Sequence, residues 1–201
     1  LYHLAGRHLT SGKDYRKAEA EQLAKLKQEA HEQLPLKISD EELEAHFDHL
    51  TPRYFRTHSL KHIHIDLTQV NRFLKRVVNG TGTKVLEPII AWHNQPARGY
   101  TSVKICTWDR PGLFTTISGA LAAADLNILS ARVFSRGDGI IIDTFFVLNA
   151  RTGGLAKRPE RDTFKKLITQ ALLPDESPEF QTQIDTLAKH GTPAEWEWPT
   201  R

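Results

Sequence analysis

The chain has 201 residues, of which 39% are hydrophobic and 25% charged, and its formal net charge is +3. These values are typical of a globular protein, and no apolar run approaches the roughly 18 residues that a transmembrane helix needs, so we expect no membrane partner. The basic residues alternate with acidic ones along the chain, which disfavours nucleic-acid binding. The single cysteine, Cys106, cannot form an internal disulfide, so we expect a cytoplasmic protein.

Residues 1–80 show helical periodicity throughout. Apolar residues at three- and four-residue steps predict a helix over 14–34 and another over 59–78. Between these helices, Ser39 and Glu42 have the spacing of a capping box, which predicts a further helix that ends before Pro52. We therefore predict an all-helical N-terminal segment that is closed by the glycines at 80–82.

Beyond Gly82 the pattern changes to strands that alternate with helices. The predicted elements are strands over 85–92 and 101–107, a helix over 112–125, strands over 128–135 and 140–148, and a helix over 160–173. The predicted fold class is therefore α+β: a helical N-terminal segment followed by a ferredoxin-like βαββαβ domain with an extra leading hairpin strand. The last strand of that unit is not evident, and only residues 195–198 look extended.

The loop after the strand at 101–107 has the chemistry of an amino-acid site. Backbone amides at a helix N-terminus suit a carboxylate, and Asp109 can pair with an α-amino group. Gly112 allows a ligand to approach the backbone closely. The alternative is purely structural, with Asp109 as the helix cap and Pro111 and Gly112 as turn residues.

Candidate catalytic and metal-binding groups are weak. His58, His62 and Asp66 follow at helical spacing that can bind a metal, but we interpret them as a solvated helix face. Cys106 is expected to be a buried, inert thiol, and Asp138 to serve in a turn. No catalytic residue, metal ligand or cofactor is therefore predicted for this segment.

Several motifs in the second half resemble the ACT domain family. They are Thr107-Trp108-Asp109-Arg110-Pro111-Gly112-Leu113-Phe114, Ile117-Ser118-Gly119-Ala120-Leu121 and Leu126-Asn127-Ile128. The stretch Ala131-Arg132-Val133-Phe134, followed by Asp138-Gly139 and Asp143-Thr144-Phe145, is similar to the first ACT domain of bifunctional uridylyltransferase/uridylyl-removing enzymes, which modify the PII nitrogen-signalling protein. His46-Phe47 and Pro52-Arg53-Tyr54-Phe55 extend this similarity into the helical segment.

This resemblance implies a regulatory segment that senses an amino acid, with glutamine expected. The ligand-binding residues that it implies are Asp109, Arg110, Pro111, Gly112, Leu113, Phe114, Asn127 and Ile128. The implied partners are the PII protein, through the parent enzyme, and another ACT domain in cis or in a homodimer. A divalent metal is expected only in the catalytic domains of the parent.

The same resemblance implies a domain organisation. Residues 1–57 are expected to be the helical tail of an HD-type domain, 58–82 a connecting helix and linker, 83–175 the ACT domain, and 176–201 a linker towards a second ACT domain. The chain starts at Leu1 and not at a methionine, and the resemblance places its two ends in neighbouring domains, so we expect a segment of a longer protein. Two alternatives stay open: an ACT interaction module without a small-molecule ligand, and a fragment that retains HD-type phosphohydrolase activity.

Overall fold

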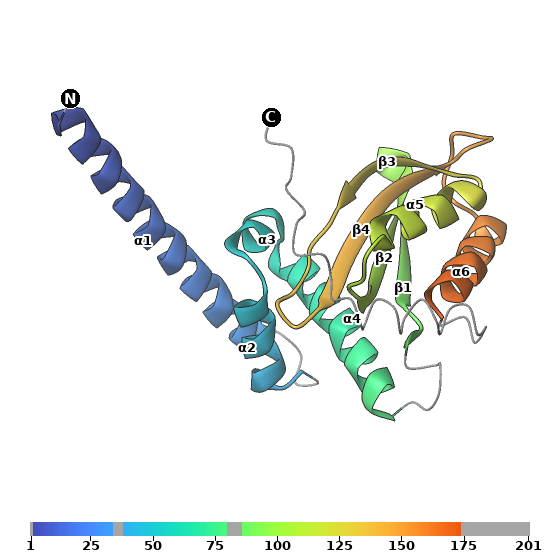
Figure 1. Cartoon of the computed structure of the whole chain (residues 1–201), viewed down its shortest axis with the longest axis horizontal. Helices are drawn as coiled ribbons and strands as arrows, with labels where there is room; N and C mark the ends of the chain where they lie inside the picture. The colour runs from blue at the N-terminus through green and yellow to red at the C-terminus, as the bar shows by residue number, and fades with distance from the viewer. Residues whose placement is uncertain (1, 34–37, 80–85, 174–201) are drawn as a thin grey trace, which may run out of the picture.

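The computed structural model describes residues 2–33, 38–79 and 86–173, with side chains from residue 17 onward. The helical segment contains α1 (Tyr2–Gln33), α2 (Asp40–His49), α3 (Pro52–Thr57) and α4 (Leu60–Asn79). After it come β1 (Ile89–Gln95), the 3-10 turn η2 (Pro96–Arg98), β2 (Tyr100–Trp108), α5 (Leu113–Ala123), β3 (Leu126–Arg132), β4 (Ile140–Asn149) and α6 (Arg158–Leu172). The predicted α+β class is confirmed, and Figure 1 shows α1 projecting away from the rest of the molecule.

Local signals explain where α2 and α3 begin. The predicted capping box is present, because the Ser39 hydroxyl accepts from the Glu42 amide at 3.2 Å and the Glu42 carboxylate accepts from the Ser39 amide at 3.1 Å. The short helix α3 was not predicted; it begins at Pro52, whose missing N–H costs nothing in a first turn. Within the described residues, no helix combines the length and apolar character that a membrane span requires.

The sheet is antiparallel throughout and has the strand order β1-β2-β4-β3. In a βαββαβ unit, the last strand pairs with the outer edge of the first, which is β2 here. The structure places β1, the predicted leading hairpin strand, on that edge. The extended stretch expected at 195–198 lies outside the described residues.

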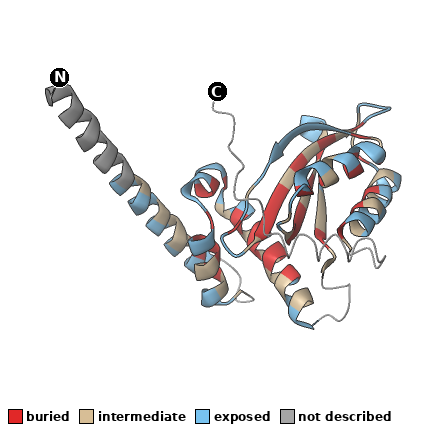
Figure 2. Ribbon diagram, in the orientation of Figure 1, coloured by how far each residue is buried: buried red, intermediate tan, exposed pale blue. Residues whose placement is uncertain are grey.

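Both faces of this sheet are covered. Helices α5 and α6 bury one face around Val103, Ile105, Phe145 and Phe164. On the opposite face, the helical segment packs against a second core, which contains Tyr54, Ile63, Phe73, Ile89, Cys106, Ile140 and Ile142. Figure 2 shows buried positions along α4 where it meets the sheet. The helix predicted as a connector is therefore also a packing partner of the sheet.

Candidate functional site

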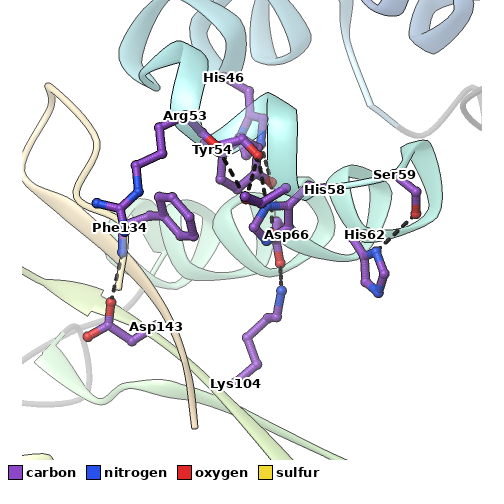
Figure 3. A network of polar contacts seen from close by, with 11 residues as sticks. His46, Arg53, Tyr54, His58, Ser59, His62, Asp66, Lys104, Phe134 and Asp143 are labelled. Atoms are coloured by element: carbon purple, nitrogen blue, oxygen red, sulfur yellow. Dashed lines mark hydrogen bonds and ion pairs between the residues drawn. The ribbon is translucent and has the colours of Figure 1, made fainter. Parts of the chain in front are cut away.

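A buried polar network joins the helical segment to the sheet (Figure 3). Its centre is Asp66 on α4, whose side chain is 0% exposed. One carboxylate oxygen accepts from the Tyr54 hydroxyl at 2.7 Å, and the other forms an ion pair with Lys104 on β2. Because a buried carboxylate without a partner is strongly disfavoured, this pair fixes how α4 sits on the sheet.

The network continues to the turn between β3 and β4 through Arg136. The Arg136 guanidinium donates to His46 Nδ1 at 3.0 Å, which leaves His46 Nε2–H to donate to the Tyr54 hydroxyl at 3.2 Å. Burial, reinforced by the Arg136 charge, lowers the pKa of His46 to about 3. Asp138 pairs with Arg136 at 2.7 Å, which agrees with the turn role predicted for it.

The interpretation of His58, His62 and Asp66 as one solvated face is wrong for two of the three residues. His58 and Asp66 are buried, whereas His62 is exposed and lies 2.9 Å from the Ser59 hydroxyl. His58 Nδ1–H donates to the Tyr54 carbonyl, and burial lowers the His58 pKa to about 4. Among the described residues, no group of three or more His, Cys, Asp or Glu side chains is arranged to hold a metal.

The loop between β2 and α5 carries Asp109, the predicted partner of an amino group. Asp109 is exposed, and its carboxylate accepts from the Ser135 hydroxyl at 3.1 Å while its amide donates to the Gly139 carbonyl at 2.7 Å. The alternative role of Asp109 as a helix cap is wrong, because the N-cap of α5 is Gly112. The side chain is therefore held at the surface, beside the β3–β4 turn.

The N-terminus of α5 lacks a side-chain cap. Gly112 has φ 73°, a left-handed conformation that favours glycine, and it has no side-chain oxygen that could accept from the first-turn amides. Leu113 N donates to the Arg110 carbonyl at 3.2 Å, and Thr116 N donates to the Gly112 carbonyl at 2.9 Å. The intervening amides at the positive end of the helix dipole can therefore receive an anion.

The other predicted loop residues have different surroundings. The Arg110 guanidinium donates to the Leu172 carbonyl at 2.8 Å, which ties the loop to the end of α6, and burial lowers the Arg110 pKa. Pro111 is exposed. Leu113 points into the core, whereas Phe114 is 50% exposed and stacks on Phe145 with ring centroids 5.6 Å apart.

Asn127 and Ile128 lie at the other end of the sheet within this chain. Both are exposed on the edge strand β3, where Asn127 pairs with Leu148. The loop follows Trp108, which pairs with Ile140 at the opposite end of β4. Eight residues of strand span about 26 Å, so one copy of the chain does not bring Asn127 to Asp109.

Two other ionisable groups are buried in the sheet. Cys106 is fully buried, as predicted, and desolvation raises the pKa of its thiol to about 12, a shift that disfavours the reactive thiolate. Asp143 on β4 accepts from the Phe134 amide at 3.2 Å. Burial, with the nearby Asp109 charge, raises the Asp143 pKa to about 7.

The region that carries the loop between β2 and α5 matches a known protein family. A family model described as "ACT domain" matches residues 101–158, which run from β2 to the start of α6. These residues form an ACT domain.

Named relatives align with this region. The chain is 35% identical over 77 residues to the "Bifunctional uridylyltransferase/uridylyl-removing enzyme" of Gluconobacter oxydans, which covers 38% of this chain and 8% of the relative. For the protein of the same name from Zymomonas mobilis, the identity is 40% over 68 residues, or 34% of this chain and 7% of the relative. The Vibrio cholerae protein of the same name is 29% identical over 112 residues, or 56% of this chain and 12% of the relative. The chain thus matches about a tenth of the length of these relatives.

The edge strand of the ACT domain exposes apolar side chains. Ile128, Leu129 and Val133 on and after β3 are more than a third exposed, and so is Phe114 at the start of α5. β3 is an outer strand of the sheet among the described residues, and Figure 2 shows it coloured as exposed along most of its length. An exposed edge with apolar side chains is suited to pairing with another strand.

Proposed function

We propose that this chain is a glutamine-sensing regulatory segment of an enzyme that adds and removes uridylyl groups on the PII protein, in cytoplasmic nitrogen regulation. Its ACT domain, together with the names of the aligned relatives, supports the class of parent enzyme. In this proposal, residues 1–57 are the tail of an HD-type domain, and the catalytic centres with their metal lie elsewhere in the parent.

The observation that carries ligand binding is the uncapped N-terminus of α5 beside the exposed carboxylate of Asp109. The first-turn amides would hold the α-carboxylate of an amino acid, and Asp109 would pair with its α-ammonium group. The hydrogen bond from Ser135 already orients the Asp109 carboxylate. Such opposite charges at neighbouring positions match a free amino acid better than a simple anion.

The same contacts provide a route to the helical segment. Asp109 contacts Ser135, and the next residue, Arg136, donates to His46 on α2. A ligand that changes the position of the Asp109 carboxylate would therefore shift the β3–β4 turn and, with it, the buried network that holds α4 on the sheet. This is allostery through differential binding to two arrangements of one interface.

A second candidate function is favoured by the exposed apolar edge of β3. In that case the ACT domain pairs with another ACT domain, in the same parent chain or in a homodimer, and binds no small molecule. Pairing would also be the way to bring Asn127 and Ile128 of one ACT domain towards the loop of another. Size-exclusion chromatography with light scattering, with and without glutamine, separates an obligatory interaction module from a ligand sensor.

We expect Asp109→Asn to weaken glutamine binding by about 10- to 100-fold, because a hydrogen bond to a charged group contributes about 1.5–3 kcal/mol. The amide retains an acceptor for Ser135, so the loop should keep its geometry. Isothermal titration calorimetry with glutamine measures the effect, and glutamate and asparagine serve as comparison ligands.

Asp125→Asn is the matched control for that titration. Asp125 follows the far end of α5 and pairs with Arg151 at 2.6 Å, and its positive φ of 57° is one that asparagine also adopts. The Asp125→Asn variant should bind glutamine with the same affinity as the unmodified chain. Binding that Asp109→Asn leaves unchanged would exclude this loop as the site, and the absence of any heat would favour the interaction module.

A further inference from the structure

A concave site lies between α4, β1 and α6, and its lining includes no residue of the amino-acid loop. It is a cavity of about 520 Å³, within the range of small-molecule pockets. Five cationic side chains line it, against two carboxylates; the cations are Arg72, Arg76, Arg158, Arg161 and Lys165. They come from two helices far apart in the sequence, so the folded structure concentrates this positive charge.

Two of these arginines are held in place by groups that do not fully neutralise them. Arg76 Nη1 donates to the carbonyls of Glu87 and Pro88 at 3.1 and 3.3 Å, and the Glu87 carboxylate is 3.8 Å away. Arg161 donates to the Ala156 carbonyl at 2.8 Å and lies over the Trp92 ring at 5.4 Å. Since a guanidinium carries five N–H donors, both retain donors for a ligand.

Two further cations are free for a ligand. Arg72 on α4 and Lys165 on α6 are exposed, and neither has a hydrogen-bond or ion-pair partner among the described residues. Arg158 pairs with Asp162 at 3.4 Å on an exposed surface, where such a pair is weak. Positive charge in the cavity therefore exceeds what the nearby acids balance.

The cationic side chains on α6 form a row along one face of the helix. Arg158, Arg161 and Lys165 stand at three- and four-residue steps on one face of the helix, over a rise of about 10 Å. A neighbouring cavity of about 640 Å³ shares Arg158 and Arg161 and adds Lys157. This elongated arrangement matches several linked phosphates better than a single carboxylate.

We propose that the cavity between α4, β1 and α6 binds the triphosphate group of a small-molecule anion. Arg76 and Arg161 are the preorganised contacts, and Arg72 and Lys165 close on the ligand from the two helices. Trp92 and Ile90 form the apolar wall of the same cavity. That wall offers a surface for a nucleobase where the triphosphate belongs to a nucleotide.

The test compares two double variants that carry the same change in charge on the same helices. Arg72→Glu with Lys165→Glu alters residues that line the cavity. Lys75→Glu with Lys166→Glu alters exposed neighbours on α4 and α6 that do not line it. Because all four side chains are exposed, both variants should fold, which circular dichroism checks.

The probes are ATP and inorganic tripolyphosphate, titrated by calorimetry at about 0.1 M salt. We expect both to bind the unmodified chain, with the cavity variant at least tenfold weaker and the neighbour variant within twofold. Tighter binding of ATP would identify a nucleotide as the source, and equal binding would identify an inorganic polyphosphate.

The proposal is overturned if neither probe binds or if both double variants weaken binding equally, since that would reflect net charge alone. It is also overturned if a single-stranded oligonucleotide binds more tightly than both probes and loses affinity equally in the two variants. Glutamine binding at the α5 loop does not enter this test, so each outcome is independent of the proposed function.

Discussion

Lys104→Ala is expected to lower the free energy of unfolding by about 3–5 kcal/mol, because it leaves the buried Asp66 carboxylate without its cation. The Lys104 side chain is 13% exposed and that of Asp66 is 0% exposed, so water cannot replace the lost partner. Urea unfolding followed by tryptophan fluorescence measures the loss. The matched control is Lys165→Ala, which removes an exposed lysine and should change the free energy by less than about 0.5 kcal/mol.

The double variant Lys104→Met with Asp66→Leu distinguishes the cost of an unpaired buried carboxylate from the cost of lost side-chain packing. Replacing both charges by apolar groups removes the unpaired carboxylate, so much of the lost stability should return. If Lys104→Ala instead costs less than about 1 kcal/mol, the pair behaves as a surface ion pair. In that case it does not fix α4 on the sheet.

Acidification is expected to weaken the same interface through His46 and His58. Their pKa values in the folded protein are about 3 and about 4, below the ordinary value of 6.5. The unfolded chain therefore binds protons first as the pH falls, and stability is lost progressively from about pH 6.5 downward. With about 1.4 kcal/mol for each pKa unit, the expected loss by pH 4 is several kcal/mol.

The titration of Asp143 changes stability with pH in the opposite direction, so the test compares the pH dependence of two chains that both contain Asp143. Its folded pKa of about 7 lies above the ordinary 3.8, and its contribution to stability therefore grows as the pH falls from about 7 to 4. Comparing urea midpoints at pH 7.5 and 4.5 for the unmodified chain and for His46→Gln with His58→Gln cancels this contribution. The double variant should lose clearly less stability on acidification; an equal loss would show that these histidines are not held neutral by burial.

The local elements were predictable from the sequence because short-range chemistry determines them. The capping box at Ser39 and Glu42 starts α2 as expected, and the apolar periodicity of 59–78 produces α4. The run Ile140-Ile141-Ile142 forms a strand that is buried on both faces. Such a run indicates a covered second face, a signal that was present in the sequence but was not used.

The polar network was missed because it depends on contacts between distant segments. Asp66 lies three residues after Ile63 and four before Val70, so it falls on the apolar face of α4 and not on the solvated face predicted for it. Its partners Tyr54 and Lys104 are 12 and 38 residues away, and no spacing rule links them. The loop residues of the candidate site were identified by resemblance, but their separation from Asn127 depends on the strand register.

Hydrogen exchange with and without glutamine tests the central claim most directly, that the amino-acid loop is coupled to the helical segment. The Gly137 amide donates to the His49 carbonyl at 2.9 Å and reports on contact between the β3–β4 turn and α2. With saturating glutamine, we expect changed protection both in the first turn of α5 and at Gly137 and the neighbouring network residues of α4. Protection confined to the loop, with exchange at Gly137 and α4 unchanged, would contradict the coupling.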